Sequence, residues 1–273
     1  METIAYEVDG RVARITLNRP ERGNGITLEM PRELAECVEQ ANLDPAVHAI
    51  ALSGAGKGFC GGYDLVEFAE REMPNHDPTQ PWDPVLDWQM MSRNLRGFMS
   101  LFHSDKPVLC KVHGFCVAGG TDMALCSDLL VIADDARIGY PPARVWGVPT
   151  SALWAFRVGD QRAKRMLFTG DLIDGATAAE WGLAIESAPA AELDERFEAL
   201  VQRVALTPVN QLVMMKLMVN QALYAQGLQA TQSLGVFFDG IARHTPEGHA
   251  FAQRAMEKGF KEAVRERDEP YDG

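Results

Sequence analysis

The sequence lacks the features that mark membrane proteins, secreted proteins and nucleic-acid-binding proteins. It has no long uncharged apolar run, and the N-terminal stretch METIAYEVDGRVARI carries early charges instead of an apolar signal core. The 26 lysines and arginines are outnumbered by 38 aspartates and glutamates, which gives a formal net charge of −12. Because nucleic acids and anionic membranes select basic surfaces, we expect neither as a partner and predict a soluble, cytoplasmic protein.

Cysteine and histidine are sparse and are not spaced as metal ligands. The five cysteines form no CxxC pair, and their odd number leaves one over. Several lie in apolar runs, which favours reduced thiols in the core or near a site over disulfides or metal ligands. His244 and His249 lie five residues apart beside an expected helix start, a weak signal, and the other histidines show no ligand spacing. We therefore predict no metal site.

Two glycine-rich segments, 53–65 and 114–128, are the most informative features that are present. Each follows a short apolar run that predicts a buried strand, at 49–53 and at 108–112, and each leads into a predicted helix. Glycine allows a backbone to approach a ligand closely, and a helix N-terminus directs free N–H groups toward negative charge. Two such loops facing one another would supply a pair of backbone donors suited to an oxyanion.

The first half of the chain predicts an α/β fold with one large core. Residues 3–18 alternate in polarity around Asp9-Gly10, which is a strong hairpin signal. Strand, glycine-rich loop and helix then recur at 49–68 and 108–127, and a further strand is expected at 129–133. This rhythm is typical of stacked ββα-like units with buried strands.

The second half predicts mainly helices. Gly170, Gly182 and Gly259 lie where helix C-caps are expected. Thr207-Pro208 and Thr245-Pro246 each resemble an N-cap followed by proline at the first helical position.

Two further segments have a distinct composition. Residues 70–85 are polar and rich in proline, which predicts a mobile loop. The methionine cluster at 214–218 belongs to an apolar stripe with helical spacing. Such a stripe indicates either core packing or a contact between subunits.

Four ordered motifs between about residue 4 and residue 265 resemble the crotonase (enoyl-CoA hydratase/isomerase) superfamily. They are Asn18-Arg19-Pro20 with Asn24, 51–65, 112–141 and 166–183. The resemblance implies a spiral of ββα units at 1–200 that binds an acyl-CoA thioester, without a separate cofactor. It also implies a C-terminal helical region at 201–273 that joins subunits into a homotrimer or a dimer of trimers.

The resemblance assigns the two oxyanion donors to the backbone N–H groups of Tyr63 and Gly119. Activating a thioester puts negative charge on its carbonyl oxygen, which two fixed donors would stabilise. The alternative is that these glycine-rich loops only permit close packing of helix on strand. The residues implied to contact CoA are Arg22, Gly25, Gly61, Leu65 and Phe115, although Arg22 could equally be an ordinary surface charge.

The sequence departs from the family pattern at both acid–base positions. Hydratases of this family hold one water between two glutamates, whereas this chain has Asp122 at the first position and Pro142 at the second. Asp122 is predicted to be catalytic, with a favourable interaction with the helix dipole as the alternative. Arg144 could face an anionic substrate or form a structural ion pair. We expect His113 to be a hydrogen-bonded structural residue.

Three functions remain open on these residues. The first is hydration of a trans-2-enoyl-CoA, which is the nominal activity of the family. The second is a reaction that needs one carboxylate, such as double-bond isomerisation, or another acyl-CoA lyase or hydrolase reaction. The third is an acyl-CoA-binding protein with impaired catalysis.

Overall fold

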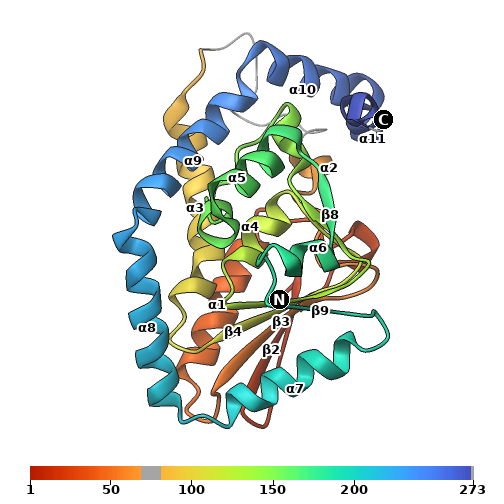
Figure 1. Ribbon diagram of the computed structural model, residues 1–273. Coiled ribbons are helices and arrows are strands. Elements are labelled where there is room, and N and C mark those ends of the chain that lie inside the picture. Colours follow the sequence, from red (N-terminus) through yellow and green to blue (C-terminus); the bar gives the residue numbers. More distant parts are fainter. Residues whose placement is uncertain (69–80, 272–273) are drawn as a thin grey trace.

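The computed structural model describes residues 1–68 and 81–271, and its centre is a six-stranded sheet (Figure 1). The first two strands are antiparallel, and every later neighbouring pair is parallel. Parallel strands are usually buried on both faces, which explains their apolar sequences. In order across the sheet the strands are β1 (Ile4–Asp9), β2 (Val12–Leu17), β3 (Ala49–Gly54), β4 (Val108–Val112), β6 (Leu129–Ala133) and β9 (Glu186–Ala188).

The predicted hairpin at the edge of this sheet is confirmed. β1 and β2 pair in the register Asp9↔Val12, which leaves Gly10 and Arg11 in the turn. Gly10 has a φ of 57°, in the left-handed region that glycine adopts at little cost. The predicted strands at 49–53, 108–112 and 129–133 are also confirmed, as β3, β4 and β6.

A smaller sheet of three strands lies beside the first. It consists of β5 (Phe115–Val117), β7 (Arg137–Gly139) and β8 (Leu172–Asp174). A β-bridge between Cys60 and Cys116 joins the first glycine-rich loop to this sheet. The two loops, which are far apart in the sequence, are therefore held side by side by backbone pairing.

Helices surround the sheets, and the predicted α/β class is confirmed. In Figure 1, α1 and α3 lie on one side of the large sheet, α7 lies along the other, and α8 to α11 continue up one edge and over the top. The helices are α1 (Met30–Leu43), α2 (Leu65–Phe68), α3 (Pro84–His103), α4 (Gly119–Leu125), α5 (Trp154–Thr169), α6 (Gly175–Glu180), α7 (Leu193–Ala205), α8 (Val209–Ala225), α9 (Leu228–Arg243), α10 (Pro246–Lys258) and α11 (Phe260–Asp268), with short 3₁₀ turns η1 (Pro20–Arg22), η2 (Pro141–Arg144) and η3 (Glu269–Tyr271).

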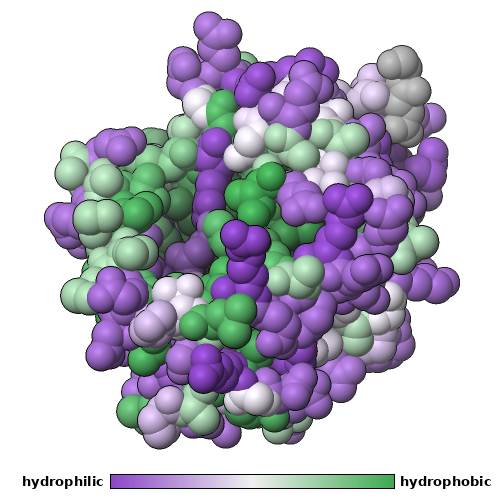
Figure 2. Space-filling view, turned by 60° about the horizontal axis from the view of Figure 1, so that its bottom comes forward, coloured by the Kyte–Doolittle hydropathy of each residue, from purple (hydrophilic) through white to green (hydrophobic). Residues whose placement is uncertain are grey.

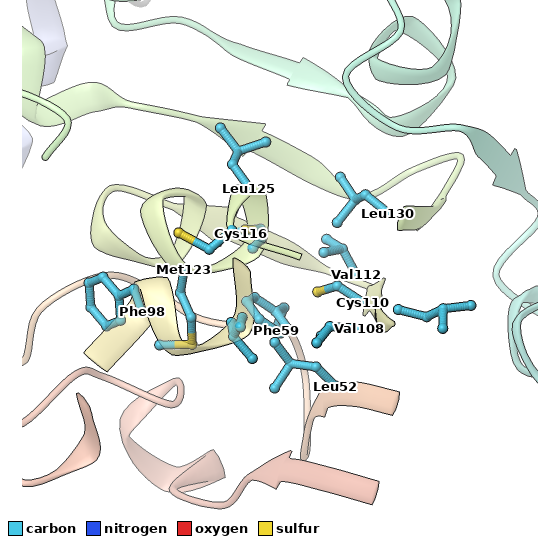
Figure 3. Packing of buried hydrophobic residues seen from close by; sticks show 14 of the residues in the cluster. Leu52, Phe59, Phe98, Val108, Cys110, Val112, Cys116, Met123, Leu125 and Leu130 are labelled. Carbon is cyan, nitrogen blue, oxygen red and sulfur yellow. The ribbon is translucent and has the colours of Figure 1, made fainter. Parts of the chain in front are cut away.

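The main core lies where β3 and β4 meet α3 and α4 (Figure 3). Leu52, Phe98 and Met123 are fully buried there. Each such side chain contributes about 1.5–3 kcal/mol by leaving water. All five cysteines are buried and unpaired, which confirms the prediction of reduced thiols.

The predicted helix ends are mostly confirmed. Gly170 ends α5 with a φ of 65°, Gly182 follows α6 with a φ of 80°, and Gly259 caps α10 with a φ of 82°. The Thr245 side chain accepts a hydrogen bond from the amide of Gly248 as the N-cap of α10. The prediction for Thr207 was wrong, because α8 begins one residue later, with Pro208 itself in the cap position and no side-chain cap bond.

The methionine cluster of α8 is not part of the core. Met215 and Met218 are 55% and 68% exposed, which contradicts core packing and leaves a contact between subunits. Figure 2 shows hydrophobic side chains gathered at the left of one face, the side along which α8 runs in Figure 1. In the described ranges, no helix combines the length and apolar character needed to span a bilayer. Most of the predicted loop at 70–85 lies on residues 70–80, outside the described ones. Its end was placed too late, because Pro84 and Val85 already belong to α3, which Asp83 caps.

The close packing of α3 on α1 depends on Gly97. A Cβ at this position would lie 2.4 Å from the carbonyl oxygen of Pro31. We expect Gly97→Ala to lower the free energy of unfolding by about 1–3 kcal/mol, although alanine has the higher helix propensity. Chemical denaturation measures this, with Gln89→Ala on the exposed face of α3 as the control. Equal stability of the Gly97 variant and the wild type would contradict the packing argument.

Candidate active site

A mainly apolar cavity of about 390 Å³ lies between the two glycine-rich loops and the helices α3, α9, α10 and α11. Tyr63 and Gly119 both line it, one from each loop. Met90 and Met91 line it from α3. The cavity is thus large enough, and apolar enough, for the non-polar part of a small-molecule ligand.

In the first glycine-rich loop, Tyr63 forms a β-bridge with Ile26, and its amide points away from Ile26. The amide of Ile26 donates to the carbonyl of Gly62 at 2.8 Å, and the amide of Asp64 donates to the carbonyl of Ile26 at 2.9 Å. In such a parallel bridge, the residue between the two hydrogen-bonded residues, here Tyr63, directs its own N–H away from the partner strand. Within the described part of the chain, the amide of Tyr63 donates no hydrogen bond.

The second glycine-rich loop brings the start of α4 against the first loop. Ala118 caps this helix with φ 54° and ψ −129°, a left-handed conformation that is rare outside glycine. Gly119 is the first helical residue, so its amide has no acceptor inside the helix. A Cβ on Gly62 would lie 2.7 Å from the Cβ of Ala118 and 3.6 Å from the nitrogen of Gly119. Only glycine at position 62 therefore lets the two loops meet.

The residues predicted to contact CoA divide into two groups. Gly61 and Leu65 line the cavity. The ring of Phe115 lies beside them, 3.7 Å from the Cβ position of Gly61. Arg22 and Gly25 are not among the lining residues. The structure therefore gathers three of these five residues near the cavity.

Arg22 and Arg19 both pair with one buried carboxylate. Their guanidinium groups lie 2.8 and 3.0 Å from the oxygens of Asp64, which is 8% exposed. Burial raises the pKa of Asp64, but the ion pairs with Arg22 and Arg19 outweigh it and hold this pKa below its ordinary value. A Cβ on Gly25 would lie 3.2 Å from the Cβ of Asp64, so glycine makes room for this cluster. CoA binding by Arg22 stays a prediction.

Asp122 lies on α4, three residues after Gly119, and is 1% exposed. Its Oδ1 accepts hydrogen bonds from the amide and the hydroxyl of Ser151, at 2.9 and 2.6 Å. Burial raises the pKa of Asp122 to about 7, against the opposing effect of these bonds. Asp122 does not line the cavity, but it interacts electrostatically with Tyr63 and Tyr140, which do. Its catalytic role stays a prediction.

The segment around Pro142 contributes no acid to the cavity. Pro142 lines the cavity from η2. Nearby Arg144 lies 2.9 Å from Asp268 and also donates to the carbonyl of Thr169 at 2.9 Å, which confirms a structural ion pair. The Nε2 of His113 lies 2.9 Å from the carbonyl of Gly56, as expected for a structural histidine.

The sequence analysis missed Asp239 and Arg243, which line the cavity from α9. Arg243 forms ion pairs with Asp239, one helical turn earlier, and with Asp87 of α3 at 3.0 Å. Asp239 Oδ1 also accepts a hydrogen bond from the amide of Val148 at 3.1 Å. The available signal was an Asp–Arg pair four residues apart inside an otherwise uncharged helix, since buried charges are usually paired.

The C-terminal helices form a wall of the same cavity. Phe251 of α10 packs against Trp146, with ring centroids 5.0 Å apart, and both line the cavity. Phe260 and Val264 of α11 line it as well. Residues of both predicted regions, 1–200 and 201–273, therefore line one cavity.

Comparison with known proteins identifies the family. A family model described as enoyl-CoA hydratase/isomerase matches residues 7–256. The chain belongs to the enoyl-CoA hydratase/isomerase family. It is 32% identical over 225 residues to a 1,2-epoxyphenylacetyl-CoA isomerase of Escherichia coli, covering 81% of this chain and 83% of the relative. The structure of an enoyl-CoA hydratase from Mycobacterium smegmatis has 60% identity and a TM-score of 0.94, covering 98% of this chain and 94% of the other.

Membership of the enoyl-CoA hydratase/isomerase family confirms the resemblance in the motifs, the mixed α/β fold with helical C-terminal region, and an enzymatic function on acyl-CoA. A hydroxycinnamoyl-CoA hydratase-lyase of Pseudomonas fluorescens is a further relative, 31% identical over 198 residues, which cover 71% of this chain and 69% of the relative. Enzymes of this family typically act without a separate cofactor. In the part of the chain that the structure describes, no group of three metal-ligating side chains converges.

The buried carboxyl of Asp122 makes a pH-dependent contribution to stability. Between pH about 4, where an unfolded aspartate titrates, and pH about 7, the folded protein retains a proton that the unfolded chain releases. Raising the pH through this window therefore destabilises the wild type, by up to about 1.4 kcal/mol per pH unit. Asp122→Asn lacks this titration and can still accept both Ser151 bonds.

We expect the stability of Asp122→Asn relative to the wild type to increase from pH 4 to pH 7 and to stay constant above it. Urea denaturation at several pH values measures the difference in free energy of unfolding between the variant and the wild type. The other titrating groups are the same in both proteins, so their contributions cancel. The exposed Asp160→Asn serves as the control. A difference that does not change with pH would contradict the raised pKa.

Proposed function

We propose that the cavity holds the acyl group of a CoA thioester and that the amides of Tyr63 and Gly119 bind its carbonyl oxygen. The observation that supports this proposal is that Tyr63 and Gly119 belong to loops in contact and both line one mainly apolar cavity. Loss of a proton from the α-carbon of a thioester puts negative charge on the carbonyl oxygen. A fixed donor in such a pair is worth about 3–4 kcal/mol of transition-state stabilisation.

The reaction favoured by this site is isomerisation of an acyl double bond. Adding water to a double bond calls for one group that takes a proton and one that gives a proton. Pro142 lines the cavity where the second such group was expected, and it has nothing to ionise. In isomerisation, one base removes a proton from one carbon and returns it to another while the oxyanion donors stabilise the dienolate.

Asp122 is the acid–base group in this proposal. It lies on the helix whose first amide is the Gly119 donor. Ser151 holds its Oδ1 and so fixes the carboxylate. A pKa of about 7 suits a group that must both accept and return a proton near neutral pH.

The reaction itself can be followed by the absorbance of the conjugated thioester. We expect a 3-enoyl-CoA to be converted to the 2-enoyl isomer, and crotonyl-CoA to lose absorbance only at the background rate. Fast loss of crotonyl-CoA without conversion of a 3-enoyl-CoA would contradict isomerisation and support hydration. Binding of several thioesters in calorimetry without turnover of any would support a binding protein.

We expect Asp122→Asn to lower kcat by about 10²–10⁴-fold with little change in KM. The wild-type rate should rise with pH around a midpoint of about 7, because the base must be deprotonated, and the variant should lose this dependence. Steady-state kinetics between pH 5 and 9 measures both, with Asp160→Asn as the control. Full activity of Asp122→Asn would contradict the assignment, and Asp239→Asn would then test the carboxylate that lines the cavity.

A cytoplasmic location also belongs to this proposal. All five cysteines are buried and unpaired. Unpaired thiols are typical of proteins in a reducing compartment.

The chain is proposed to assemble as a homotrimer or a dimer of trimers through its C-terminal helical region at 201–273. The support is an exposed apolar surface on α8, where each large side chain is more than half exposed. It consists of Met214, Met215, Leu217, Met218 and Val219. Exposed apolar patches of this kind usually mark protein–protein contacts.

We expect Met215→Lys combined with Met218→Lys to reduce the assembly to smaller species, because two buried ammonium groups would oppose the contact. Light scattering after gel filtration measures the mass. Met256→Lys is the matched control, since Met256 is 56% exposed and lies on α10. A monomeric wild type, or an unchanged assembly in the double variant, would contradict the proposed interface.

A further inference from the structure

One wall of the mainly apolar cavity carries polar side chains that the proposed reaction does not use. Tyr140, Asp239 and Arg243 all line this wall. The Tyr140 residue is 4% exposed and lines the cavity, and its hydroxyl forms no hydrogen bond with another described residue. A buried tyrosine hydroxyl normally has a partner. The missing partner at a cavity wall indicates a position for a ligand atom.

Tyr140 and Asp239 meet at the same short segment of backbone. A Cβ on Gly147 would lie 3.4 Å from the hydroxyl oxygen of Tyr140. The next residue, Val148, donates its amide to Asp239 Oδ1 at 3.1 Å. Tyr140 and Asp239 also interact electrostatically. The Tyr140 hydroxyl and the Asp239 carboxylate therefore both lie against the backbone segment 147–148, a phenol donor beside Gly147 and a carboxylate acceptor at Val148.

The position of Asp239 is fixed by the docking of α9. A Cβ on Gly235 would lie 2.8 Å from the carbonyl oxygen of Pro149, and a Cβ on Gly240 would lie 3.1 Å from the Cβ of Asp87. The two glycines thus let α9 approach its neighbours closely on either side of Asp239. The ion pair with Arg243 orients the carboxylate further. Two hydrogen bonds leave a carboxylate with unused acceptor sites.

We propose that Tyr140 and Asp239 form a subsite for a hydroxyl group carried by the acyl chain of the substrate. The acyl hydroxyl donates to the Asp239 carboxylate and accepts from the Tyr140 hydroxyl. A neutral hydroxyl can do both, whereas a methyl group leaves both protein groups unpaired. An acyl carboxylate would be repelled by Asp239. This specificity rests on the proposed function, because it assumes that the cavity holds the acyl group.

The test is calorimetric binding of saturated acyl-CoAs of one chain length, with the hydroxyl moved along the chain. At one position beyond carbon 3, the hydroxyacyl-CoA should bind at least about tenfold more tightly than the unsubstituted acyl-CoA. The compound with a carboxylate at that position should bind more weakly than the unsubstituted one.

Two tyrosine variants separate the subsite from general effects on folding. Tyr140→Phe removes only the hydroxyl and should reduce the hydroxyl preference by about tenfold. Tyr6→Phe is the matched control, since the Tyr6 hydroxyl is also buried without a partner among the described residues but does not line the cavity. It should keep the preference of the wild type.

Equal binding of all hydroxyl isomers and the unsubstituted chain would overturn the subsite. A preference confined to the 3-hydroxyacyl-CoA would also overturn it, because that compound is the product of 2-enoyl-CoA hydration and would be bound as such. So would an unchanged preference in Tyr140→Phe. If none of the acyl-CoAs binds at all, the proposed function fails first.

Discussion

The position of the residues in the site depends on the contact between the two glycine-rich loops. Gly62 comes so close to Ala118 and Gly119 that any side chain at position 62 would push the loops apart. The same contact holds Ala118 in a left-handed conformation, whose cost of order 1–3 kcal/mol the surrounding packing must offset. In return, the start of α4 lies against the loop that carries Tyr63. The β-bridges at Tyr63 and Cys60 set this arrangement from the backbone alone.

The remaining walls of the cavity come from parts of the chain that are distant in sequence. α9 is docked through two glycines and carries a buried ion-pair cluster with α3. α10 and α11 add aromatic and aliphatic side chains. Truncation or misdocking of the C-terminal helices would therefore open the cavity to water and weaken every polar interaction inside it. The helices that extend the fold also complete the site.

Both loops, their preceding strands and the family were accessible from the sequence, because glycine spacing and apolar runs are local signals. The proline at position 142, where the resemblance implies a second acid, was equally visible. The surroundings of Asp122 were not. The hydrogen bonds that hold its carboxylate come from Ser151, which is 29 residues away in the chain. The contribution of Asp239 and Arg243 was also hidden, since a helical Asp–Arg pair is most often on the surface.

The sequence by itself determined the α/β class, the hairpin, most helix ends and the family. These depend on residue type, on periodicity and on contacts between near neighbours. Tertiary structure alone decided which polar groups share the cavity, which arginines are committed to ion pairs, and which apolar stripe stays exposed. Those outcomes depend on distances between segments that only the folded chain brings together, and local sequence patterns do not fix such distances.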